Sequence, residues 1–190
     1  MFTRTYGDTP IGEEGGLDGA ILLAGSPRPL FEISYDQNIQ SINDSLSAGL
    51  LSQEQADGLF AMVAAMLEEA QNLPNMTEEE MQGALIFGVP AIWQRSLYDS
   101  LPLPIISRNA IPTLILHGDR DFQVFTESDF NVFVEHTEGY AHVQTILYDG
   151  ITHIFTPAQT DFNDIREYMI AGRVDAQVLR DIVDWIIENK

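Results

Sequence analysis

Residues 112–118 have the sequence PTLILHG, in which an unbroken apolar run follows a proline and ends in histidine and glycine. Two other stretches are similar: DGAILLAG at 18–25, and VQTILY at 143–148, which is followed by Asp149 and Gly150. Each run has the length of a strand and is too short for a helix. Because the first two runs are nearly continuous in apolar residues, they favour strands of a parallel sheet that is covered on both faces. The sequence therefore predicts an α/β fold.

Helical patterns fill the intervals between these strands. Ser52 and Gln55 form a capping box, and Thr77 and Glu80 form a second one. Apolar residues at three- and four-residue steps after the first box predict one buried helix face. That face comprises Ala56, Leu59, Phe60, Val63, Met66, Leu67 and Ala70.

Two more helices are predicted towards the C-terminus. Residues 125–136 lie between the second and third strands and have a helical pattern. Asp175 is the expected N-cap of a final helix. We expect its inward face to comprise Val178, Leu179, Ile182, Val183 and Ile186.

The interval between the first two strands is far longer than the dozen or so residues that a crossover connection requires. We interpret residues 27–110 as a helical insertion that forms a lid. Residues 18–26 and 111–190 are then a partial α/β core, and residues 1–17 are an irregular N-terminal segment.

The charge excludes two classes of partner. The chain has 29 acidic and 9 basic residues, for a formal net charge of -20. Such a field repels phosphate backbones and anionic lipid surfaces, so we expect no nucleic-acid or membrane binding. The scarcity of lysine leaves two interpretations open, a salt-adapted (halophilic) surface or an ordinary acidic protein.

Composition also bears on chemistry and compartment. The absence of cysteine excludes disulfides and thiol catalysis. No apolar run is long enough to span a bilayer. Residues 1–16 contain no apolar stretch of the kind found in signal peptides. We therefore expect a soluble protein and favour the cytoplasm.

An acid and a histidine follow neighbouring strands. Asp121 comes three residues after Gly118, and His153 comes shortly after the strand that ends at Tyr148. The carboxyl ends of parallel strands share one edge of the sheet, where open α/β sheets bind ligands. A carboxylate that hydrogen-bonds one imidazole nitrogen leaves the other nitrogen free to act as a general base.

The stretches IPTLILHGDRDFQV (111–124) and LYDGITHIF (147–155) together resemble the C-terminal half of the α/β-hydrolase fold. This resemblance implies that Asp121 is the acid and His153 the histidine of a catalytic triad, in the family's chain order. DGAILLAGSPRPL (18–30) resembles the strand after the nucleophile helix. GVPAIWQRSLYD (88–99) resembles the end of a lid in esterase-like and serine-peptidase-like members, and VLRDIVDWI (178–186) resembles the closing helix.

The family's nucleophile is absent from this pattern. The sequence contains no G-x-S-x-G, and the seventeen residues before Asp18 contain no serine. Ser26 follows the first strand and is a weak nucleophile candidate, with a turn serine as the alternative. We therefore interpret the chain as the C-terminal part of a hydrolase in truncated form. Its open first strand should cause self-association or pairing with a complementing N-terminal chain.

The remaining candidates have structural alternatives. Asp119 is expected to be a loop residue, and Thr152 to shape the turn before His153. His117 with Asp119 and Asp121 has the spacing of metal ligands, but no second histidine supports that, so we expect no metal. His136 and His142 look structural or solvated. Four lid residues either form core or line an apolar substrate pocket: Phe60, Met66, Phe87 and Trp93.

Two functions remain open at this stage. In the first, the chain is part of a serine hydrolase that acts on carboxylic esters, or second on amides and peptides, without a cofactor. Alone it would be inactive, because it lacks a nucleophile. In the second, the chain is a non-catalytic remnant or interaction module that keeps the hydrolase fold.

Overall fold

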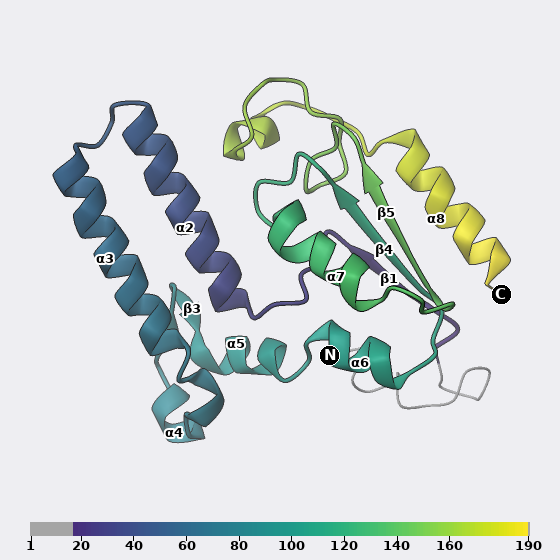
Figure 1. The fold of residues 1–190 in the computed structure, drawn as a ribbon, viewed down its shortest axis with the longest axis horizontal. Helices are drawn as coiled ribbons and strands as arrows, with labels where there is room; N and C mark the ends of the chain where they lie inside the picture. Colours follow the sequence, from purple (N-terminus) through teal and green to yellow (C-terminus); the bar gives the residue numbers. More distant parts are fainter. Residues whose placement is uncertain (1–16, 190) are drawn as a thin grey trace. The chain divides into compact units, whose positions relative to one another are not determined.

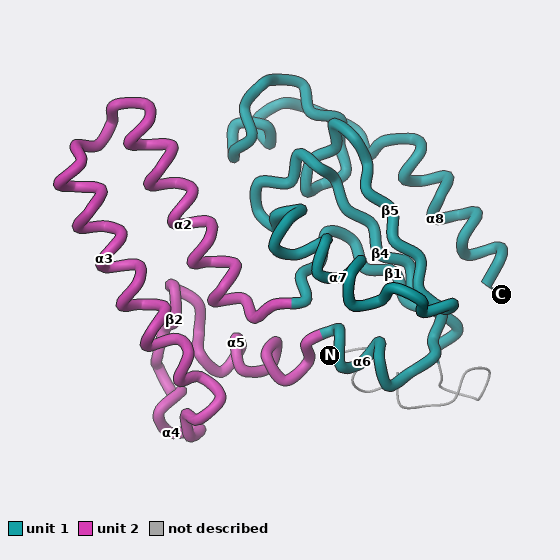
Figure 2. The backbone as a smooth tube through the Cα atoms, in the orientation of Figure 1, with its two compact units in different colours: residues 1–27, 102–190 teal, residues 28–101 magenta. Residues whose placement is uncertain are grey.

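The structure is a computed structural model that describes residues 17–189. The predictions of an irregular segment over 1–17 and of no signal peptide therefore concern residues that, Leu17 apart, lie outside this range. The chain divides into two compact units, one of residues 1–27 with 102–190 and the other of residues 28–101 (Figure 2).

A three-stranded parallel sheet forms the centre of the first unit. Its strands are β1 (Ala20–Leu23), β4 (Thr113–Gly118) and β5 (Val143–Tyr148), in the order β1-β4-β5. They coincide with the three apolar runs, so the predicted α/β class is confirmed. Every residue of the central strand β4 is buried, whereas Leu23 of β1 and Leu147 of β5 are exposed. Among residues 17–189, full coverage on both faces is therefore seen for the central strand and not for its two neighbours.

Helices cover both faces of this sheet (Figure 1). On one face, Leu114 and Leu116 of β4 pack against Val178 and Trp185 of the last helix. On the opposite face, Ile115 forms a separate cluster, because side chains alternate along a strand. Its partners there are Ile106, Phe130 and Phe133. The helices of the unit are α6 (Pro102–Arg108), a π-helical turn η2 (Thr126–Phe130), α7 (Asn131–His136), a 3₁₀ turn η3 (Ile165–Met169) and α8 (Ala176–Glu188).

The second unit is mostly helical. The long helices α2 (Leu30–Ser47) and α3 (Gln53–Ala70) pack side by side around Ile42, Ala56 and Val63 (Figure 1). The capping boxes at Ser52 and Thr77 are both present, which confirms these helix starts. The predicted apolar face of α3 is also the buried one. The other elements are η1 (Leu73–Asn75), α4 (Glu78–Met81), the short antiparallel pair β2 (Leu85–Ile86) and β3 (Val89–Pro90), and α5 (Ala91–Tyr98).

The second unit is shorter than the predicted insertion over 27–110. Helix α6 belongs to the first unit, because Ile106 packs with Ile115 of the sheet. In the sequence, these residues fall within the predicted insertion because they lie between the first two apolar runs. The role of the predicted insertion, residues 27–110, as a lid stays a prediction.

The buried face of the final helix, α8, differs from the face that the sequence predicted to be buried. Asp175 caps it through the backbone N–H of Gln177, as expected. Its inward residues are Val178, Ile182 and Trp185, whereas Leu179, Val183 and Ile186 are exposed. The apolar residues on this helix extend around more than one face, and periodicity alone therefore did not identify which face would be buried.

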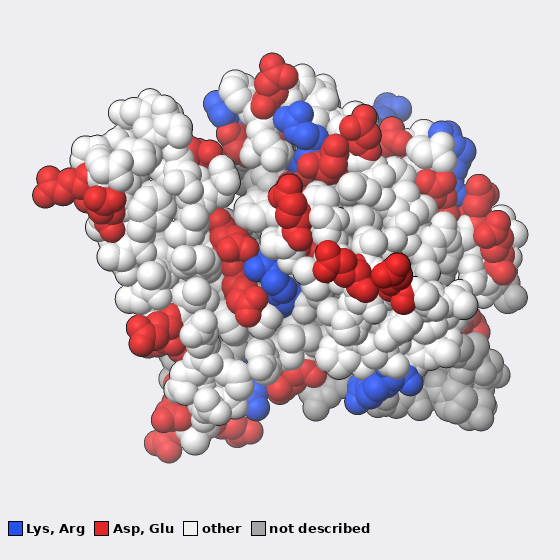
Figure 3. Space-filling model, viewed as in Figure 1, with Lys and Arg blue, Asp and Glu red and all other residues white. Residues whose placement is uncertain are grey.

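Acidic side chains are spread over the surface shown in Figure 3, with few basic ones between them, in keeping with the net charge of -20. Among residues 17–189, no helix has the length and apolar character that crossing a bilayer requires.

Candidate active site

Asp121 lies in the turn that follows β4 and is buried, with 3% of its surface exposed. Its Oδ1 accepts hydrogen bonds from the backbone N–H groups of Gln123 (2.8 Å) and Val124 (2.9 Å). Such bonds to a carboxylate oxygen are charge-assisted and short. They fix the orientation of the carboxylate, and its second oxygen remains available for another donor.

His153 provides that donor from the turn after β5. Its Nδ1 lies 2.8 Å from Asp121 Oδ2. The side chain of His153 is 27% exposed, whereas that of Asp121 is fully buried. Among the described residues, none hydrogen-bonds Nε2 of His153. The structure therefore brings together the acid and the histidine that the sequence predicted would meet.

The turn that carries His153 is tightly closed. The N–H of Thr152 donates to the carbonyl of Thr156 (3.0 Å), and the N–H of Phe155 donates to the carbonyl of Thr152 (2.9 Å). Thr152 Oγ1 also bonds the Thr156 backbone and hydroxyl. Phe155 has φ of 58°, a left-handed conformation that is rare for a bulky side chain. Thr152 thus shapes this turn, as predicted.

The loops after β4 and β5 are held together at Gly118. A Cβ built on Gly118 would lie 2.2 Å from the carbonyl oxygen of Ile151, so only glycine permits this approach. The same carbonyl accepts the N–H of Arg120 (2.9 Å). Asp119 Oδ1 accepts the N–H of Gly150 (2.7 Å), which confirms Asp119 as a loop residue. This network links the two loops that carry Asp121 and His153.

Ser26 lies in the loop that follows β1. Its hydroxyl donates a hydrogen bond to Oδ1 of Asp129, a buried carboxylate in η2. Oδ2 of Asp129 accepts the N–H of Phe125 (3.0 Å) and the hydroxyl of Ser128 (3.1 Å). In this arrangement Ser26 joins the end of β1 to the start of the helix after β4.

The other histidines lie in different environments. His117 is buried on β4 and stacks on Phe130, with ring centroids 5.4 Å apart. His136 is exposed, with Nε2 3.2 Å from Ser107 Oγ. His142 stacks on Tyr140, and its buried Nε2 has no hydrogen-bond partner among the described residues. Within residues 17–189, no group of three or more His, Asp or Glu side chains is arranged to hold a metal ion.

The predicted substrate-binding residues all lie in the second unit. Phe60 and Phe87 are half-buried and pack with Ile42 and Val63 in that unit's own core. Met66 is half-buried, and Trp93 is 54% exposed. These four side chains contribute to the packing and surface of the second unit, and their contact with substrate stays a prediction.

The segment between His153 and α8 also contacts the site, which the sequence did not indicate. The Tyr168 hydroxyl hydrogen-bonds the side-chain amide of Gln123, and its ring lies 5.0 Å from that of Phe122. Burial, with the Asp121 carboxylate as a smaller cause, raises the pKa of Tyr168. Arg120 donates to the carbonyls of Thr160 (3.3 Å) and Phe162 (3.1 Å). This region has no periodic pattern that would have predicted it.

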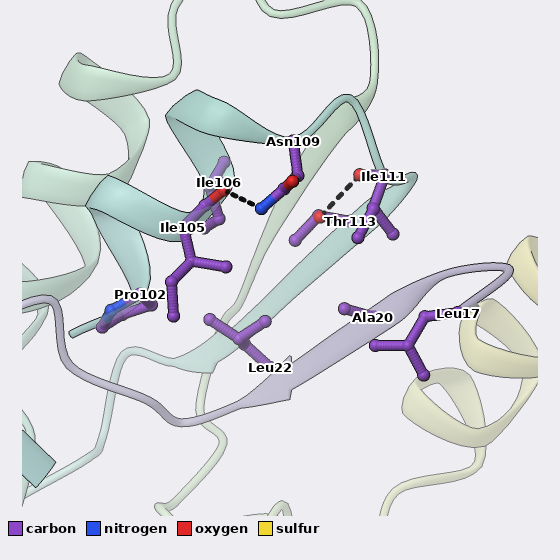
Figure 4. Close-up of a pocket in the computed structure, with 9 residues that line it drawn as sticks. All are labelled: Leu17, Ala20, Leu22, Pro102, Ile105, Ile106, Asn109, Ile111 and Thr113. Atoms are coloured by element: carbon purple, nitrogen blue, oxygen red, sulfur yellow. Dashed lines mark hydrogen bonds between the residues drawn. The ribbon is translucent and has the colours of Figure 1, made fainter. Parts of the chain in front are cut away.

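An apolar pocket of about 110 Å³ lies at the amino ends of β1 and β4, away from Asp121 and His153 (Figure 4). Ala20 and Leu22 of β1 line it together with Ile105 and Ile106 of α6, and Thr113 begins β4 beside it. Because Asp121 and His153 follow the carboxyl ends of β4 and β5, this pocket is not part of their site.

A comparison with curated proteins finds one clear relative. Esterase EstD of Thermotoga maritima is 28% identical to this chain over 178 residues. The resemblance to an α/β-hydrolase is confirmed. The matched region is 94% of this chain but 39% of the esterase, so the chain spans well under half of that relative's length. No protein-family model matches the chain. No solved structure matches it significantly.

Proposed function

We propose that this chain carries the acid and the base of a serine-hydrolase site for carboxylic esters, with amides or peptides as second candidates. The observation that supports this most directly is the 2.8 Å contact between Asp121 Oδ2 and His153 Nδ1. The similarity to an esterase supports ester hydrolysis in general. No cofactor enters the proposed reaction.

The geometry supports the following roles. Asp121 is held by two backbone N–H groups and orients the His153 ring through Nδ1. Nε2 of His153 would then accept the proton of a serine hydroxyl as that oxygen attacks the ester carbonyl. It would return the proton to the departing alcohol. Asp121 stabilises the imidazolium that forms between these two transfers.

We propose that the serine comes from outside this chain. The hydroxyl of Ser26 donates a hydrogen bond to the buried Asp129, and the sequence contains no G-x-S-x-G. A complementing chain that bears such a motif would supply the nucleophile. The same contacts fit a non-catalytic interaction module, which is the second candidate.

A fluorophosphonate probe and p-nitrophenyl acetate test this proposal. We expect neither labelling nor turnover by the chain alone. Labelling that Ser26→Ala abolishes would contradict the proposed source of the nucleophile. Addition of the portion of esterase EstD that this chain does not match should give turnover above that of the added portion alone.

Variants in the complemented assay test the two roles. Asp121→Asn and His153→Ala should each reduce turnover by about 10³–10⁴-fold. His136→Ala is the matched control, because its ring is exposed and contacts Ser107 instead. Turnover that survives His153→Ala would refute the proposed base. Absence of turnover in every combination would favour the non-catalytic module.

A further inference from the structure

His117 occupies an unusual place directly beneath the Asp121–His153 pair. It is on the buried strand β4, and only 1% of its surface is exposed. Its ring stacks on Phe130 with an interplanar angle of 20°. A buried imidazole normally has hydrogen-bond partners for both nitrogens. Nε2 of His117 has none among the described residues.

That nitrogen is directed towards the site through one shared atom. Nε2 of His117 lies 3.8 Å from Asp121 Oδ2, which is the same oxygen that His153 Nδ1 contacts at 2.8 Å. Two imidazole rings therefore flank a single buried carboxylate oxygen, one from the core and one from the solvent side. The roles proposed above for Asp121 and His153 do not by themselves require a histidine at position 117.

We propose that His117 is a positioning residue that acts on His153 through Asp121. While its ring is neutral, the whole charge of the carboxylate is available to His153. Once His117 takes up a proton, it attracts Oδ2 of Asp121 towards the core. The negative charge of that carboxylate then interacts with both rings instead of with His153 alone. Its significance for catalysis rests on the proposed base role of His153, whereas the coupling itself does not.

The surroundings of His117 favour its neutral form. Burial is the largest influence and lowers the pKa of His117, and the neighbouring His153 also lowers it. The carboxylates of Asp121 and Asp129 raise it, as does the backbone of Val124. When two ionisable groups share a carboxylate in this way, the proton affinity of each depends on the state of the other.

NMR titration of the full chain with isotope-labelled histidine tests the coupling without any need for turnover. We expect His117 to titrate below the usual histidine range. Asp121→Asn should lower the pKa of His117 further, because a favourable negative charge is lost. His153→Gln should raise it, because the neighbouring His153 lowers the pKa of His117. His142→Gln is the matched control, since that ring is also stacked and has a buried, unpartnered Nε2.

A second signal reports on the site itself. The proton between His153 Nδ1 and Asp121 should give a low-field resonance that changes in step with protonation of His117. In His117→Gln this step should vanish while the resonance remains. A step that persists in His117→Gln would overturn the proposal, as would a His117 titration that neither neighbour affects. If His117→Gln fails to fold by circular dichroism, the Asp121→Asn and His153→Gln titrations still decide it.

Discussion

At the scale of single residues, the site depends on a glycine, which has no side chain beyond its α-hydrogen. Gly118 lets the carbonyl of Ile151 approach the end of β4, and the loops that carry Asp121 and His153 are joined there. A glycine that ends a strand is an ordinary sequence feature. Its importance here comes from the backbone that packs against it.

Gly118→Ala tests this close approach. The added methyl group would overlap the Ile151 carbonyl, so we expect the free energy of unfolding to fall by about 1–3 kcal/mol. The contact between Asp121 and His153 should also lengthen. Urea unfolding and the low-field histidine resonance measure the two effects. Gly25→Ala is the control, because only Leu22 lies within 4 Å of its added Cβ, at ordinary contact distances. Equal stability of the two variants would contradict the argument.

His117 also predicts a dependence of stability on pH. Its pKa is lowered in the folded state, whereas in the unfolded chain it should be near 6.5. Between these two values the unfolded state binds more protons, so the free energy of unfolding should decrease as the pH falls below about 6.5. Urea unfolding at several pH values should show this slope in the wild type and a smaller slope in His117→Gln. The exposed-site variant His136→Gln should retain the wild-type slope.

At the scale of elements, helix α8 shows how an apolar sequence can pack on an unexpected face. Trp185 is buried against the sheet and approaches Gly19, where an added Cβ would lie 2.7 Å from the indole ring. Leu179, on the other hand, is 51% exposed. Leucine, valine and isoleucine side chains lie on more than one face of α8, so their spacing is compatible with burial of several faces. In the structure, the face that carries the Trp185 indole is the buried one.

Paired substitutions in α8 distinguish these faces. Trp185→Ala should reduce the free energy of unfolding by about 3–5 kcal/mol, because it removes a large buried ring. Leu179→Ala should change it by about 0.5 kcal/mol or less, as surface substitutions usually do. Thermal and urea unfolding measure both. A large loss in Leu179→Ala at low protein concentration would show that the predicted inward face was right.

At the scale of the whole molecule, the sheet has exposed edges. Within residues 17–189, β1 pairs with β4 on one side only, and its Leu23 side chain is exposed. Unprotected strand edges tend to pair with other chains. We expect the 21.2 kDa chain to form larger species at micromolar concentration, as measured by light scattering. Leu23→Lys should shift the population towards the monomer, and a wild-type chain that is already monomeric would refute this.

The charge of -20 predicts a response to salt. Like charges on a compact surface repel each other, and dissolved ions screen that repulsion. If the surface is salt-adapted, the melting temperature should be higher in molar KCl than in dilute buffer. A melting temperature that is unchanged or lower would favour the ordinary acidic protein.

Much of this architecture could be predicted locally. The three strands, both capping boxes and the N-cap Asp175 follow from short-range rules, because strand and helix signals involve residues within a few positions of each other. The meeting of Asp121 and His153 could also be predicted. Parallel pairing of β4 with β5 brings the loops after both strands to the same edge of the sheet.

The sequence by itself therefore determined the class of fold, the order of acid and histidine, and the resemblance to a hydrolase. Only the tertiary structure decided that α6 joins the sheet unit, that Trp185 rather than Leu179 faces the core, and that Ser26 bonds Asp129. It also decided that His117 lies against the same oxygen as His153. These outcomes depend on contacts between residues that are distant in sequence. Local patterns are equally compatible with several helix faces and side-chain partners, and packing and burial select among them.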